Sequence, residues 1–77
     1  MVDHLTRITV DLREPRAEAI ARTLAEQGFS VRRERRRLVA DSTVVEAQDA
    51  KRALLARGFR DREFQVQLEY VRQWGIL

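Results

Sequence analysis

Residues 30–42 read Ser-Val-Arg-Arg-Glu-Arg-Arg-Arg-Leu-Val-Ala-Asp-Ser, and the interpretation of this stretch decides the fold. Alternating hydrophobic residues are typical of a β-strand that is buried on one side. Here the alternation changes phase, because Val31 and Val39 occupy odd positions whereas Leu38 and Ala40 occupy even ones. No single strand can direct all four side chains into one core.

A break in the strand near residues 34–36 resolves this conflict. An unbroken strand would place three arginines on the same face as the two valines. We therefore predict two short strands, at about 30–34 and 37–41, joined as a hairpin. The connecting residues include no Gly or Asn, so the turn is not one of the favoured two-residue types.

Upstream of the hairpin, the sequence predicts a strand followed by a helix. Residues 5–12 alternate with a period of two and carry β-branched residues on one side. Residues 15–27 have hydrophobic residues at the spacing of an amphipathic helix. Pro15 suits the first position of that helix, and Gly28 suits the position just after its end.

Downstream of the hairpin, the same order of elements follows. The residues Thr43-Val44-Val45-Glu46 match the capping-box pattern at a helix start, which predicts a helix over about 44–57 that ends at Gly58. The last strand alternates cleanly over 64–70, and its parity continues toward Trp74 and Ile76.

The chain also resembles itself at an offset of 30 residues. Residues 8–32 align with 38–62 with seven identities, three of which form a glycine-terminated helix end. The identical pairs are Asp11/Asp41, Ala17/Ala47, Arg22/Arg52, Leu24/Leu54, Gly28/Gly58, Phe29/Phe59 and Arg32/Arg62. Duplication and convergence on a common helix cap both explain this pattern, since Leu, Gly and Phe at these positions form a recurrent cap.

Two strand–helix–strand units in succession predict the α+β, ferredoxin-like βαββαβ fold, with a four-stranded antiparallel sheet and both helices on one face. We predict one domain over residues 1–77, with halves at about 5–34 and 37–71 and an apolar C-terminal tail at 72–77. The predicted core comprises Ile8, Val10, Leu12, Ile20, Leu24, Phe29, Val31, Leu38, Ala40, Val44, Leu54, Phe59, Phe64, Val66, Leu68 and Tyr70.

Composition removes several classes of chemistry. The 77 residues include no cysteine and one histidine, His4, which excludes disulfides, thiolate metal sites and histidine-rich zinc sites. No nucleophile–base set and no Gly-rich phosphate loop is present, so we expect neither an enzyme nor a cofactor. No hydrophobic run is long enough to span a membrane, and no signal-peptide core is evident, so we expect a cytoplasmic protein.

Two carboxylates are related by the internal repeat. Asp11 and Asp41 both come near the ends of strands that are adjacent in the ferredoxin-like order. They could form a carboxylate pair or a site for a hard cation, or they could be outward-facing polar residues next to loops.

The densest charge in the chain is the arginine cluster of Arg32, Arg33, Arg35, Arg36 and Arg37. Three interpretations are open. The arginines could be a solvated hairpin edge that discourages aggregation, a site for nucleic-acid phosphates, or a surface for an acidic protein partner.

The helix-free face of the predicted sheet is polar, of mixed sign and without aromatic residues. RNA-binding sheets of this topology stack bases on aromatic rings, so we expect no such recognition here. The residues predicted to face outward are Arg7, Thr9, Asp11, Arg32, Glu34, Arg37, Val39, Asp41, Gln65, Gln67, Glu69 and Val71.

The C-terminal segment carries a second candidate site, a protein interface at Tyr70, Val71, Trp74, Ile76 and Leu77. Trp74 could fold back over the core, or the segment could pair with another chain. We predict a non-catalytic protein-interaction module that forms a homodimer or binds a protein partner through this edge and the open sheet face. The alternative is an accessory nucleic-acid-binding module that uses the arginine cluster; no small-molecule substrate or membrane partner is indicated.

Overall fold

The architecture comes from a computed structural model, which describes the backbone of residues 4–70. Within these residues the chain forms four strands and two α-helices in the predicted order, and one short 3-10 helix that was not predicted. These elements are β1 (His4–Asp11), α1 (Ala17–Glu26), β2 (Ser30–Glu34), β3 (Arg37–Ser42), α2 (Ala47–Ala56), η1 (Asp61–Glu63) and β4 (Gln65–Tyr70).

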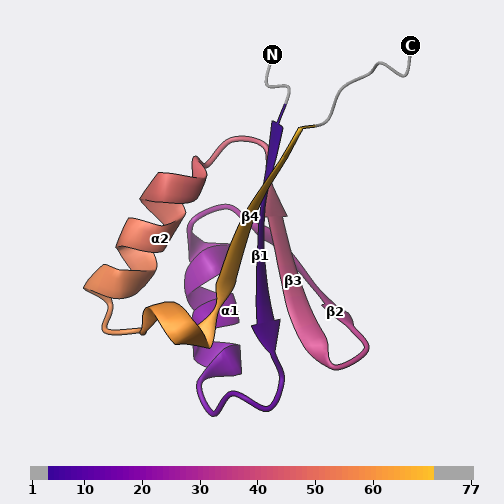
Figure 1. Cartoon of the computed structure of the whole chain (residues 1–77), viewed down its shortest axis with the longest axis vertical. Helices are drawn as coiled ribbons and strands as arrows, with labels where there is room; N and C mark the ends of the chain where they lie inside the picture. Colours follow the sequence, from indigo (N-terminus) through magenta and orange to yellow (C-terminus); the bar gives the residue numbers. More distant parts are fainter. Residues whose placement is uncertain (1–3, 71–77) are drawn as a thin grey trace.

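The sheet has the order β2-β3-β1-β4, and every neighbouring pair of strands is antiparallel. Both helices lie on the same side of the sheet (Figure 1). This is the ferredoxin-like βαββαβ arrangement, so the predicted fold is confirmed.

The strand break that forms the hairpin lies within the predicted segment. Glu34 pairs with Arg37, which leaves Arg35 and Arg36 as a two-residue turn. Arg35 has a φ of 56°, whereas two-residue hairpin turns favour Gly or Asn at positions with positive φ. The turn is therefore short even though its sequence is unfavourable for that geometry.

Both helices end in the predicted glycine cap. At the end of α1, the Gly28 N–H donates to the Ala25 carbonyl at 3.1 Å, and the Phe29 N–H donates to the Leu24 carbonyl at 3.0 Å. Gly28 has a φ of 102°, which an L side chain adopts only with strain. The end of α2 repeats this geometry at Gly58, where φ is 93°.

The two halves differ in length at the start of the last strand. Arg33 pairs with Leu38, so an exact 30-residue repeat would pair Glu63 with Ile8. Instead Val66 pairs with Ile8, three residues later. The three residues of η1 account for this shift. The Arg32/Arg62 identity in the sequence alignment therefore joins two positions that are not structurally equivalent.

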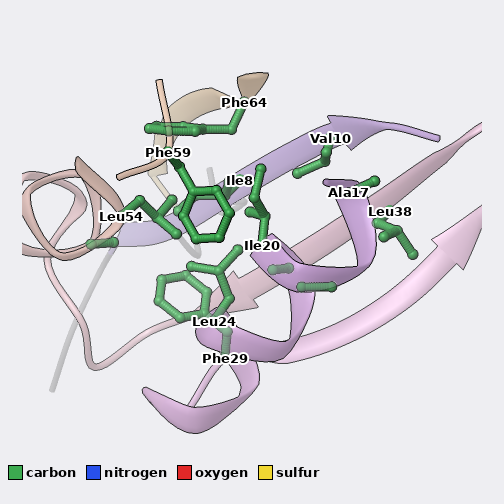
Figure 2. Close-up of a cluster of buried hydrophobic side chains, with 13 residues drawn as sticks. Ile8, Val10, Ala17, Ile20, Leu24, Phe29, Leu38, Leu54, Phe59 and Phe64 are labelled. Carbon is green, nitrogen blue, oxygen red and sulfur yellow. The ribbon is translucent and has the colours of Figure 1, made fainter. Parts of the chain in front are cut away.

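The core lies between the sheet and the two helices, as Figure 2 shows. Most predicted core residues are buried, and Leu12, Val31 and Val66 are partly buried against them. The side chains of Leu68 and Tyr70 lie outside the described part of the structure. The confirmed buried positions are Ile8, Val10, Ile20, Leu24, Phe29, Leu38, Ala40, Leu54, Phe59 and Phe64.

The predicted start of the second helix is wrong, and so is the predicted burial of Val44. Helix α2 begins at Ala47, and Val44 is 83% exposed. The hydroxyl oxygen of Ser42 accepts hydrogen bonds from the N–H groups of Val44 and Val45, both at 3.0 Å. This local turn at the end of β3 holds residues 43–46 outside the helix, so Val44 points away from the core.

Candidate functional site

The helix-free face of the sheet is crossed by a chain of ion pairs. Arg7 lies opposite Asp41 in the β1–β3 register, and its Nε donates to Asp41 Oδ1 at 2.7 Å. Arg32 reaches the same carboxylate, with Nη1 2.6 Å from Oδ2, and its Nε donates to Glu34 Oε2 at 2.6 Å. Burial alone would raise the pKa of Asp41, but the hydrogen bonds from Arg7 and Arg32 outweigh it and lower that pKa.

Two residues in the middle of this face are buried although no helix covers them. Val39, which we predicted to face outward on the helix-free face, is 1% exposed, and Thr9 is 8% exposed. Val39 lies between Thr9 and Arg32 in the strand registers. Val39 therefore lies on the helix-free face as predicted, but it is buried there, since the long side chains of ion-paired arginines cover apolar surface.

The two repeat-related aspartates do not meet. Asp41 lies opposite Arg7, whereas Asp11 lies opposite Arg37, four positions further along β1. Each carboxylate is bonded to a different arginine, because Asp11 accepts from Arg13. The interpretation as a carboxylate pair is therefore wrong. Across the described residues, no group of three or more His, Cys, Asp or Glu side chains could hold a metal ion.

The predicted arginine cluster is divided among three surfaces. Arg32 belongs to the ion-pair chain on the open face. Arg33 has the opposite parity, and its Nη2 lies 3.6 Å from Glu18 Oε2 on α1. The remaining three, Arg35, Arg36 and Arg37, lie at the hairpin turn. The cluster is therefore not one continuous basic surface.

The three turn arginines line a pocket at one end of the sheet. The hairpin turn, the end of β1 and the start of β4 meet at that end (Figure 1). Arg62, on η1, joins them in the lining. Sequence reasoning missed Arg62, because the 30-residue repeat equates it with Arg32. The other lining residues are Thr9, Asp11, Glu14, Glu34, Glu63, Phe64 and Gln65.

Two of the carboxylates in this lining are neutralised by arginines that do not line the pocket. Asp11 Oδ2 accepts from Arg13 Nη2 at 2.9 Å, and this hydrogen bond is the main cause of the lowered pKa of Asp11. Glu34 is bonded to Arg32, which likewise lowers the pKa of Glu34.

Glu63 is the most deeply held of the lining acids, at 9% exposure. It accepts two hydrogen bonds from Arg16, at 2.9 and 2.5 Å, and one from the Arg60 N–H at 2.7 Å. Arg16 also donates to the Gly58 carbonyl at 3.1 Å and lies 4.8 Å above the centre of the Phe59 ring. These contacts fix η1 against the start of α1, and they fix the position of Arg62 with it.

The sheet has two unequal edges. Among the described strands, β2 pairs only with β3, and β4 pairs only with β1. The β2 edge carries charges at Arg32, Arg33 and Glu34, whereas β4 has no charged residue from Gln65 to Leu68. Of the predicted C-terminal interface, only the backbone of Tyr70 is described, as part of β4. Val71, Trp74, Ile76 and Leu77 lie outside the described residues.

No described helix is long and apolar enough to cross a membrane. No family model, no curated protein and no solved structure matches the chain. The fold is therefore assigned from its topology, and the function is argued from the side chains and edges described above.

Proposed function

We propose that this domain is a non-catalytic interaction module that self-associates by pairing the outer edge of β4 with β4 of a second copy. The observation that carries the proposal is a run of four uncharged residues, Gln65 to Leu68, on one of the two sheet edges. An edge strand presents backbone N–H and C=O groups that can pair with another chain. Charged side chains on an edge oppose such pairing.

The contrast between the edges favours β4. In β2, a strand of five residues, three consecutive residues from Arg32 to Glu34 are charged and oppose pairing with another strand. On β4, four consecutive residues from Gln65 to Leu68 are uncharged in a strand of six. Strand β4 is therefore the edge available for the addition of another strand.

The sequence of β4 is compatible with antiparallel pairing to itself. A two-fold axis perpendicular to the sheet keeps every side chain on its own face, so each residue lies opposite a residue of the same parity in the second copy. The axis therefore lies midway between one residue and its own copy. With the axis at Gln67, Gln65 lies opposite Glu69 and Val66 lies opposite Leu68. In this register no like charges lie opposite each other. Pairs of like charges would destabilise the pairing. The same operation on β2 about Arg32 would oppose two guanidinium groups.

The ion pairs on the open face of the sheet favour the β4 edge, rather than the open face, as the interface. The central charges of the open face are already joined through Asp41, whose side chain is only 16% exposed. Burying these ion pairs against a partner would remove water from them, at a cost that their mutual attraction does not repay. Edge pairing extends the sheet and leaves this face in solvent.

Sedimentation velocity of the full chain tests the proposal. We expect the unmodified chain to form a dimer in the micromolar range and Gln67→Lys to sediment as a monomer, since it places two ammonium groups opposite each other. Ser30→Lys is the matched control, because it adds the same charge to the β2 edge, and it should leave the dimer intact. A monomeric unmodified chain at several hundred micromolar, or a dimeric Gln67→Lys chain, would contradict the proposal.

A further inference from the structure

The pocket at the end of the sheet is lined by four guanidinium groups that form no hydrogen bond or ion pair with a described carboxylate. Arg35, Arg36, Arg37 and Arg62 are all exposed and line it. None of these four guanidinium groups forms a hydrogen bond or ion pair with another described residue. They come from two segments that are separated by 25 positions in the sequence and meet only in the fold.

The carboxylates of the pocket offset only part of this charge, because Arg36 and Arg37 contribute less to the lowered pKa of Asp11 and of Glu34 than the arginines bonded to those groups. Asp11, Glu34 and Glu63 are each bonded to an arginine outside the lining. Only Glu14 is a lining acid with no side-chain hydrogen bond or ion pair among the described residues. Four guanidinium groups without a hydrogen bond or ion pair therefore line the pocket together with one such carboxylate, Glu14. The charge of the pocket stays positive, because the other three lining acids are each bonded to an arginine outside it.

The backbone at the hairpin tip gives a second, independent indication. Arg35 has a φ of 56° in a two-residue turn, where Gly carries no steric cost. A non-glycine residue held at positive φ in a turn costs stability, and such residues concentrate at functional sites. An arginine at this position lowers stability and places a guanidinium at the rim of the pocket.

We propose that this pocket binds the phosphate backbone of a nucleic acid, through Arg35, Arg36, Arg37 and Arg62, without reading the base sequence. Guanidinium groups bind phosphate in bidentate geometry, and several of them along a rim suit a ligand that carries several phosphates. Among the described residues, the only aromatic side chain in the lining is that of Phe64, which is 7% exposed and buried in the core, so the described lining offers no ring that could stack on a base. The proposal therefore predicts binding that depends on salt and not on sequence.

This site differs from the surface that the sequence suggested. Arg32 and Arg33 are excluded from it, since the first is bonded to Asp41 and Glu34 and the second lies next to α1. Arg62 is added to it. The site does not require dimerisation through β4, because every guanidinium group that forms it comes from one copy, although Gln65 belongs both to the lining and to the β4 edge.

Fluorescence anisotropy with a labelled 20-nucleotide oligo(dT) and a labelled 20-base-pair duplex, from 25 to 200 mM NaCl, tests the proposal. We expect Arg62→Gln to weaken binding roughly tenfold at low salt and to make the slope of log affinity against log salt shallower by about 1. Arg33→Gln and Arg22→Gln are the matched controls, since each removes the same charge outside the pocket, and both should retain binding.

Arg35→Gly separates binding from folding. Because glycine removes the strain at positive φ, the variant should raise the thermal midpoint while it weakens binding roughly tenfold. This rules out unfolding as the cause of the lost affinity.

Three results would overturn the proposal. The first is no binding of either labelled probe at 25 mM NaCl. The second is equal losses of affinity for Arg33→Gln and Arg62→Gln, which would mean a diffuse charge effect. The third is complete competition by equimolar pyrophosphate, which would assign the pocket to a small phosphate compound.

Discussion

The guanidinium group of Arg16 holds the carboxylate of Glu63 across 47 residues of sequence, with one nitrogen–oxygen distance of 2.9 Å and another of 2.5 Å. Arg16 immediately precedes α1, and Glu63 ends the turn of η1. This pair joins the first half of the domain to the second at the point where β4 begins. It thereby positions both the edge strand and Arg62.

The Arg16–Glu63 pair gives the domain a specific dependence on pH. The hydrogen bond from Arg16 is the main cause of the lowered pKa of Glu63, and the Arg60 N–H adds to it. Because the folded-state pKa lies below the ordinary value of 4.5, the stabilisation is complete above that value and is lost as the pH falls through the folded-state pKa.

We therefore expect Glu63→Gln to lower the thermal midpoint at pH 7 and to match the unmodified chain more closely at pH 3. Circular dichroism melts across that range measure the difference between the two proteins. A difference that stays constant from pH 7 to pH 3 would mean that the charge of Glu63 does not stabilise the fold.

Substitution of either cap glycine tests the helix ends. An added Cβ at Gly28 or Gly58 meets no atom within 4 Å, so the cost of alanine comes from the backbone conformation alone. We expect Gly28→Ala and Gly58→Ala each to lower the free energy of unfolding by about 1–2 kcal/mol in urea titrations. Losses near zero for both would show that these positions do not need left-handed geometry.

The hydroxyl of Thr6 is a buried polar group without a hydrogen-bond partner among the described residues. Thr6 is 0% exposed, and valine has nearly the same shape. We expect Thr6→Val to raise the free energy of unfolding by about 1 kcal/mol, because it removes an unsatisfied oxygen without opening a cavity. Thr6→Ser, which keeps the oxygen and loses the methyl group, should be destabilising. A less stable valine variant would show that the hydroxyl has an undescribed partner.

Two hydrophobic residues near α2 should respond very differently to truncation. Leu54 is fully buried, and Leu54→Ala should cost about 2–5 kcal/mol of unfolding free energy. Val44 is 83% exposed, and Val44→Ala should change the free energy of unfolding by less than about 0.5 kcal/mol. Similar losses at both positions would restore the original expectation that Val44 belongs to the core.

The fold could be predicted because its decisive features are local in the sequence. The change of phase between Val31 and Leu38 locates the hairpin, and the Leu24-Gly28-Phe29 spacing marks a helix end within six residues. Each feature depends on backbone preferences that neighbouring residues determine. Val44 was misplaced because a capping-box pattern competes with the Ser42 turn, and the sequence alone does not decide between them.

The candidate site could be predicted only in part, because it depends on contacts between distant segments. The arginine run identified three of the four pocket arginines but also included Arg32 and Arg33, whose partners come from other elements. Arg62 reaches the pocket only because η1 inserts three residues before β4. The burial of Val39 likewise depends on side chains from neighbouring strands, which alternation within one strand does not reveal.

The charge-complementation experiment at Gln67 tests the central claim, self-association through β4, most directly. Gln67→Lys and Gln67→Glu should each sediment as monomers, because the two-fold axis places each new charge opposite its own copy. An equimolar mixture of the two variants should form a heterodimer, since the opposed charges then attract. Monomers in the mixture, or dimers of either variant alone, would contradict pairing of β4 with its own copy about Gln67.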